Sequence, residues 1–163
     1  MVLKLKAIPF FCCLGTTKSK TPDQQEYRKI DYQYPLDVGY IALANGAESY
    51  HLVSAMGANK NSSIFYSRTK GEVEESLKII PFKCIIIYRP SLLEGKRTEK
   101  RFLESISNTV MHLINPLLSG SLKKYRSIKV EDVALAMLKQ SLEDKKGIFT
   151  CQSDQIQDLS MNN

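Results

Sequence analysis

The chain contains 163 residues, of which 43% are hydrophobic and 25% are charged, and it carries a formal net charge of +6. This composition is typical of a globular protein and predicts one domain over residues 1–163 with a hydrophobic core of its own. It excludes an intrinsically disordered chain, a coiled coil and a disulfide-rich scaffold. No run of 18 or more apolar residues occurs, so no membrane span is predicted.

The basic residues are concentrated between Lys83 and Lys129, where ten basic residues stand against three acidic ones. Because this region matches no known nucleic-acid-binding module, a solvated basic face is favoured over a nucleic-acid partner. The two histidines have no cysteine or carboxylate at ligand spacing, so no metal site is expected. The four cysteines form no Cys-x-x-Cys motif, which favours reduced thiols in a cytoplasmic protein.

Short apolar runs alternate with helical patterns, which predicts an α/β fold with a parallel sheet and helices on both faces. Residues Ala7–Cys13 are expected to form the first buried strand, followed by a turn at Leu14–Thr17. A helix is expected over about residues 23–44 and ends at Asn45-Gly46. Pro35 lies within this helix and predicts a kink or break near Tyr34.

The second strand is expected at Ser49–Ser54, and a helix at Ile64–Lys78 follows it, capped by Ser62 or Ser63. Three glutamates are assigned to the solvent side of this helix. They are Glu72, Glu74 and Glu75.

The third strand, Lys83–Tyr88, is almost continuously hydrophobic, as in a strand that is covered on both faces. A helix over about Lys100–Leu118, a final helix at Glu131–Leu142 and a short last strand at Ile148–Cys151 complete the expected elements.

A possible proton-transfer pair lies on the helix that follows the second strand. Tyr66 and Lys70 are four residues apart and therefore share one helix face, directed at the strand ends where open α/β sheets bind ligands. A neighbouring cation is expected to lower the pKa of the tyrosine, which favours proton exchange with a carbonyl or an alcohol. Ser54, at the end of the strand, supplies a hydroxyl for the substrate oxygen. A second Tyr-x-x-x-Lys, at Tyr125 and Lys129, lacks this context.

The chain resembles the atypical short-chain dehydrogenase/reductase superfamily, in particular small NAD(P)H-binding oxidoreductases similar to the Tat-interacting protein. The resemblance extends in order over nearly the whole chain. The matching segments are Phe11–Thr17, Tyr27–Tyr32, Leu52–Ala58, Asn61–Ser63, Tyr66–Glu72, Tyr88–Ser91, Tyr125-Arg126 and Glu131–Ala134.

The resemblance implies a Rossmann-type sheet with NADP or NAD lying across the strand ends. It implies that Gly15 and Thr16 pass beside the cofactor, that Tyr66 is catalytic, that Lys70 binds the nicotinamide ribose, and that Pro90 approaches the nicotinamide. The catalytic hydroxyl falls at Ser54 or one or two residues later, where this chain has Ala55 and Met56.

The glycine-rich turn that holds the diphosphate in dinucleotide-binding folds does not occur in this sequence, where the closest two glycines are Gly39 and Gly46. The resemblance explains this by a truncated domain that begins at the family's fourth strand. Weak or no cofactor binding is therefore expected, and strand 7–13 becomes an apolar sheet edge suited to self-association.

Two hypotheses follow. The first is an NAD(P)-dependent oxidoreductase that acts on an unknown small carbonyl substrate, with impaired cofactor binding. The alternative is a non-enzymatic interaction module, or an inactive truncated relic of the same fold.

Overall fold

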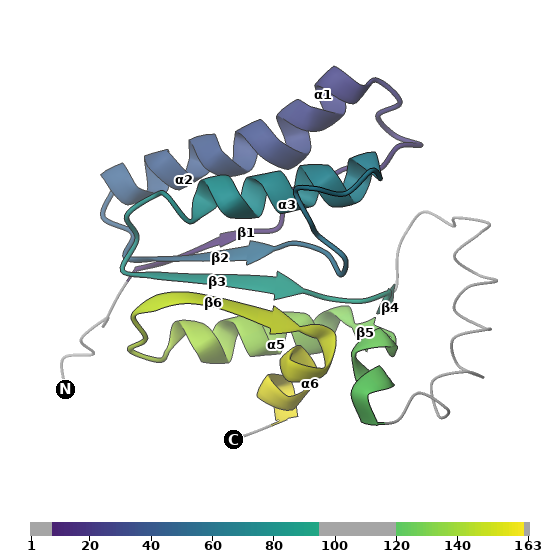
Figure 1. Cartoon of the computed structure of the whole chain (residues 1–163). Coiled ribbons are helices and arrows are strands. Elements are labelled where there is room, and N and C mark those ends of the chain that lie inside the picture. The colour runs from purple at the N-terminus through teal and green to yellow at the C-terminus, as the bar shows by residue number, and fades with distance from the viewer. Residues whose placement is uncertain (1–7, 95–119, 162–163) are drawn as a thin grey trace.

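The computed structural model describes residues 8–94 and 120–161 and shows an α/β fold built on a parallel sheet (Figure 1). Four strands form this sheet in the order β1-β2-β3-β6, and all three pairings are parallel. Helices cover both faces of the sheet, with α1, α2 and α3 on one side and α5 and α6 on the other. The predicted fold class, a partial Rossmann-type sheet, is confirmed.

The first strand, β1 (Pro9–Cys12), leads through a loop into α1 (Gln24–Arg28), a π-helical turn η1 (Lys29–Gln33) and α2 (Tyr34–Ala44), which are continuous. The expected break near Tyr34 is instead this π-helical turn. Pro35 has no N–H and its ring crowds the carbonyl four residues earlier, that of Asp31, so the backbone widens just before the proline.

The next unit consists of β2 (Ser49–Val53), α3 (Phe65–Leu77) and β3 (Cys84–Arg89), close to the predicted bounds. The cap of α3 differs from the prediction because Ile64 occupies the N-cap position, while the Ser62 hydroxyl accepts a hydrogen bond from the Ile64 N–H.

The solvent-side assignment on α3 fails for one glutamate. Glu74 is buried, whereas Glu75 is exposed.

The C-terminal part begins with short elements, β4 (Leu93–Glu94), the 3-10 helix η3 (Gly120–Tyr125) and β5 (Ile128–Lys129). Strands β4 and β5 pair in a separate two-stranded sheet. The helix expected at 100–118 lies outside the described residues.

The final strand of the main sheet, β6 (Gly147–Gln152), lies between two helices in sequence, α5 (Val130–Ser141) and α6 (Ser153–Met161). Helix α6 was not predicted. It is short, at nine residues, and Ile156 is its fully buried apolar side chain.

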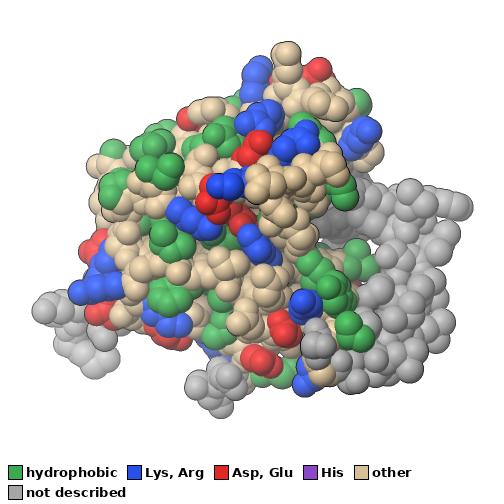
Figure 2. Space-filling view, in the orientation of Figure 1, with side chains coloured by type: hydrophobic (Ala, Val, Ile, Leu, Met, Phe, Trp, Pro, Cys, Tyr) green, Lys and Arg blue, Asp and Glu red, His purple; other side chains and the backbone are tan. Residues whose placement is uncertain are grey.

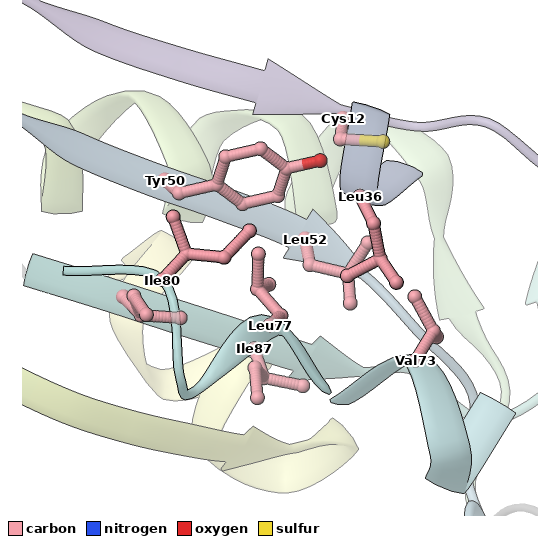
Figure 3. Close-up of a cluster of buried hydrophobic side chains, with 9 residues drawn as sticks. Cys12, Leu36, Tyr50, Leu52, Val73, Leu77, Ile80 and Ile87 are labelled. Carbon is pink, nitrogen blue, oxygen red and sulfur yellow. The ribbon is translucent and has the colours of Figure 1, made fainter. Parts of the chain in front are cut away.

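Two apolar clusters hold the helices on the sheet. Cys12, Leu52 and Ile87 stand side by side on three paired strands and meet Leu36 of α2 and Val73 of α3 (Figure 3). On the opposite face, side chains of β3 pack against α5 and α6. Members of this second cluster are Cys84, Ile86, Tyr88, Ile128, Val133, Ala136, Met137 and Ile156. The sheet is thus covered on both faces at β3, as its hydrophobic sequence predicts.

Strand β1 lies at one edge of the sheet, and within the described part of the chain it pairs with β2 alone. Ile8 and Phe11 are partly exposed there, with 55% and 40% of their surfaces accessible. No helix in the described ranges is both long and apolar enough to cross a membrane. On the face shown in Figure 2, Lys and Arg side chains are interspersed with Asp and Glu.

A buried histidine makes the fold sensitive to acid. His51 on β2 is 1% exposed, and its ring nitrogens lie 3.3 Å from the Ser49 hydroxyl and 3.1 Å from the Tyr88 hydroxyl. Burial lowers the pKa of His51 from 6.5 to about 4. The unfolded chain therefore binds a proton between these pH values that the folded chain does not, and stability falls as the pH drops.

We expect the free energy of unfolding to fall by about 3 kcal/mol from this histidine between pH 6.5 and pH 4, given 1.36 kcal/mol per pKa unit. Urea unfolding of the wild type and of His51→Gln at several pH values measures the difference. Parallel pH dependences in the two proteins would contradict the assignment.

Candidate active site

A crevice of about 690 Å³ opens at the carboxyl ends of β1 and β2. It is bounded by the β1–α1 loop, by α1 and η1, and by the first turns of α3. The predicted site residues that line it are Gly15, Thr16, Ser54, Tyr66 and Lys70. Further lining residues used below are Lys18, Tyr27 and Asp31. Five of the six predicted site residues are thus brought together.

Helix α3 presents Tyr66 and Lys70 to this crevice from consecutive turns. Tyr66 lies at the mouth, with 43% of its surface exposed, whereas Lys70 lies deep and is 6% exposed. The helical spacing therefore places a phenol and an ammonium in one cavity, as the sequence predicts.

Lys70 is held by a carboxylate that the sequence analysis did not assign to the site. Its Nζ atom lies 2.8 Å from Oδ1 of Asp31, whose side chain is completely buried. The other oxygen, Oδ2, accepts a hydrogen bond of 2.7 Å from the Thr16 N–H. Asp31 thus joins α3 to the loop that follows β1.

The β1–α1 loop closes tightly over this ion pair. A Cβ atom at Gly15 would lie 3.3 Å from Asp31 Oδ1 and 3.5 Å from Lys70 Nζ, so the close approach favours glycine. The next residue, Thr16, is held at its carbonyl by the Tyr27 hydroxyl and at its hydroxyl by Thr21. The loop residues expected beside a cofactor are therefore fixed by hydrogen bonds.

Ser54 lines the crevice, but its hydroxyl proton is already used. Its Oγ donates a 2.5 Å hydrogen bond to Oε1 of Glu74, and the same carboxylate binds Arg89 through both of its oxygens. Ser54 in this structure can therefore accept a hydrogen bond from a substrate, while donating one requires a change of partner.

The other candidate positions lie beside the crevice. Ala55 is buried and has no hydroxyl, and the backbone N–H of Met56 donates to the carbonyl of Pro90. Pro90 itself is buried and does not line the crevice. The structure therefore does not bring Pro90 to the cavity with the other predicted residues.

The expected lowering of the Tyr66 pKa is not observed. Loss of solvent and the Asp31 carboxylate raise the pKa of Tyr66 above its ordinary value of 10.0. The first physical reason is that burial disfavours the charged phenolate, and the second is that the Asp31 carboxylate opposes the charge of the Lys70 ammonium.

The sequence analysis missed Asp31 and Glu74, although the sequence contains a feature near each of them that relates to its position. Asp31 stands four residues before Pro35, where a helix interrupted by proline widens and turns a side chain out of register. For Glu74, the neighbouring Val73 and Leu77 place this side of α3 near the core, but only the position of Arg89 on β3 explains a buried carboxylate.

Three residues of the crevice could hold part of a cofactor. Lys70 provides a cation, and Gly15 and Thr16 provide closely approached backbone next to Tyr66. The sequence offers no glycine-rich turn for the diphosphate. In the described ranges, no group of three or more His, Cys, Asp or Glu side chains is placed to hold a metal ion.

The partial Rossmann-type fold is shared with several solved structures. The structure is similar to the Bordetella bronchiseptica enzyme WbmG in complex with NAD, with a TM-score of 0.60 over 93% of this chain and 53% of that one, at 12% identity. It is also similar to MoeE5 in complex with UDP-glucose and NAD, with a TM-score of 0.62 over 97% and 64% of the two chains, at 12% identity. A UDP-N-acetylglucosamine 4-epimerase from Bacillus cereus gives a TM-score of 0.61 over 95% and 64%, at 13% identity. This fold therefore holds NAD in two of these neighbours.

In sequence, the chain is similar to fungal proteins named Fmp52, mitochondrial. It is 33% identical to protein fmp52-1 of Aspergillus terreus over 147 residues, which are 90% of this chain and 63% of the relative. It is 33% identical to FMP52 of Candida albicans over 139 residues, covering 82% and 61%. The chain thus spans less than two thirds of the length of these relatives.

No family model matches the chain. The relatives' names contradict the expected cytoplasmic location, which was wrong because cysteine usage reports a reducing environment and not a particular compartment.

Proposed function

We propose that the protein is an oxidoreductase of the short-chain dehydrogenase/reductase type that binds NADP or NAD and reduces a small carbonyl compound. The observation that supports this most strongly is the placement of Tyr66 and Lys70 in one crevice at the carboxyl ends of two parallel strands. The resemblance to oxidoreductases similar to the Tat-interacting protein supports the same activity. The names of the relatives support a mitochondrial location.

In this proposal each residue has a distinct role. The Tyr66 hydroxyl gives its proton to the carbonyl oxygen, and water then reprotonates the phenolate. A bound reduced nicotinamide would supply the hydride for the carbonyl carbon. Lys70 holds the nicotinamide ribose, and Gly15 and Thr16 offer backbone contacts. Ser54 orients the substrate oxygen by donating its hydroxyl proton to it, which requires that the hydroxyl turn away from Glu74. Pro90 acts through the Met56 backbone beside the site.

Cofactor affinity in this chain is expected to be weak. The diphosphate receives no glycine-rich turn and no helix N-terminus of the usual kind from this sequence. Binding energy then comes mainly from the nicotinamide half, so the Kd for NADPH or NADH lies well above the submicromolar range.

Removing the Tyr66 hydroxyl tests the activity. We expect Tyr66→Phe to lower the rate of NADPH or NADH oxidation with a panel of small carbonyl compounds at least about 100-fold, the range of a lost general acid. The matched control is Tyr125→Phe, because Tyr125 and Lys129 have the same spacing and Tyr125 does not line the crevice. Equal loss in both variants would contradict the assignment.

The second candidate is an interaction module without turnover. It is favoured by the missing glycine-rich turn and by the engagement of the Ser54 hydroxyl with Glu74. Absence of any NADPH or NADH oxidation by the wild type would favour this candidate over the oxidoreductase.

We also propose that the chain associates with itself through the edge strand β1. Size-exclusion chromatography with light scattering should show a dimer or larger species at high micromolar concentration, because an open apolar edge pairs with another strand. Phe11→Lys on β1 should shift the protein towards monomer. Phe149→Lys, at a comparably exposed position on the opposite edge strand β6, is the control. A monodisperse wild-type monomer would contradict the proposal.

A further inference from the structure

We propose that Asp31 is a positioning residue of this site, whose buried carboxylate fixes the Lys70 ammonium at the base of the crevice that Tyr66 also lines. The proposal rests on the proposed function, in which the Tyr66 phenol gives its proton to the carbonyl oxygen beside that ammonium. The effect on the Tyr66 proton can nevertheless be measured without substrate or cofactor.

The position of the Lys70 ammonium follows from the geometry of its ion pair with Asp31. Asp31 uses both carboxylate oxygens within the site, one 2.8 Å from Lys70 Nζ and one 2.7 Å from the Thr16 nitrogen. The side chain of Asp31 is 0% exposed and that of Lys70 is 7% exposed, so water competes little for either charge. A lysine has a long flexible stem, and this ion pair selects one position for its ammonium at the base of the crevice.

The protonation of Tyr66 depends on the charged groups around it. The titratable groups that line the crevice together with Tyr66 are Lys70 on its own helix, Asp31 on η1, Tyr27 on α1, Lys18 on the β1–α1 loop, and Cys13 directly after β1. Asp31 is the one carboxylate among these lining groups. Its charge opposes that of Lys70, and Asp31 acts together with burial to raise the pKa of Tyr66. Without the carboxylate, the ammonium would favour the phenolate.

The position of Asp31 follows from the helix that carries it. Asp31 is the central residue of the π-helical turn Lys29–Gln33, in which the Tyr34 N–H donates to the Lys29 carbonyl. This widened turn lies directly before Pro35 and contacts α3, the helix of Tyr66 and Lys70. The proline thereby shapes the segment that delivers the carboxylate to Lys70.

The test is the titration of Tyr66 by NMR in the full chain labelled with ¹³Cζ-tyrosine, with Tyr66→Phe used to assign the resonance. In Asp31→Asn, which keeps the shape and removes the charge, we expect the Tyr66 midpoint to fall by at least about one pH unit. Asp31→Glu should restore a midpoint close to that of the wild type. The control is Glu72→Gln. Glu72 lies on α3, as Tyr66 does, and its carboxylate pairs with Arg28 outside the crevice.

An unchanged midpoint in folded Asp31→Asn, or an equal change in Glu72→Gln, would overturn the proposal. If Asp31→Asn does not fold, Lys70→Gln provides the reciprocal measurement, since loss of the ammonium leaves Asp31 uncompensated and should raise the Tyr66 midpoint. An unchanged midpoint there would overturn the proposal as well. Because no turnover is needed, a failed reductase assay combined with the expected shifts would reject the oxidoreductase and retain the role of Asp31.

Discussion

Replacing Glu74 with alanine is expected to lower the free energy of unfolding by about 3 kcal/mol, the range for breaking a buried ion pair on one side. The Glu74 side chain is 1% exposed and receives hydrogen bonds from the Ser54 hydroxyl and from two nitrogens of Arg89. Its removal leaves the partly buried guanidinium of Arg89 without its carboxylate. Urea unfolding followed by circular dichroism gives the difference directly.

The neighbouring glutamate provides a matched control. Glu75 lies one position further on α3, and its side chain is 46% exposed in ion pairs with Lys78 and Lys60. Glu75→Ala should change stability by about 0.5 kcal/mol or less, as exposed pairs do. Equal effects of the two substitutions would show that Glu74 is not buried in the folded protein.

The second large effect is expected at Gly71, which also lies on α3. A Cβ atom at this position would stand 2.1 Å from the Lys60 nitrogen and 2.3 Å from the carbonyl carbon of Asn59. These are backbone atoms of the loop after β2, so relief requires the loop or the helix to move. We expect Gly71→Ala to destabilise the protein by about 3 kcal/mol or more, the upper range for overpacking.

Because Gly71 follows Lys70 directly, this substitution should also disturb the crevice. Thermal unfolding measures the loss of stability, and the NMR resonances of Tyr66 and Lys70 report the local change. Ser67→Ala, one turn earlier on α3, adds no atom and should leave both readouts close to those of the wild type. A Gly71→Ala protein as stable as Ser67→Ala would show that the helix and loop are not in contact.

The course of the main sheet was predictable from the sequence because its strands are short apolar runs. Strand β3 (Cys84–Arg89) is covered on both faces of the sheet, and its nearly continuous hydrophobic sequence predicts this. Helix α6 escaped prediction because it is held by the last strand and by α5, and its own sequence is mostly polar. Its contacts with α5 and β6 are tertiary contacts, which the local sequence does not show.

The candidate site was predictable only in part. The four-residue spacing of Tyr66 and Lys70 is a local property of a helix, and the structure places both in the crevice. Asp31 lies 39 positions before Lys70 in sequence, and their contact depends on how two helices pack. The direction of the Tyr66 pKa shift was predicted wrongly, because the sequence shows neither the burial of the phenol nor the nearby Asp31 carboxylate. Pro90 was assigned by resemblance alone, and its carbonyl is used by the Met56 backbone.

In the proposed function, the crevice beside Tyr66 and Lys70 receives the nicotinamide end of a dinucleotide. Titration of the ¹⁵N-labelled chain with NADH or NADPH, followed by NMR, tests it most directly. We predict saturable shifts at Gly15, Thr16, Tyr66 and Lys70, with a Kd well above the submicromolar range. Shifts confined to other surfaces, no shifts at saturating cofactor, or submicromolar binding would contradict the account.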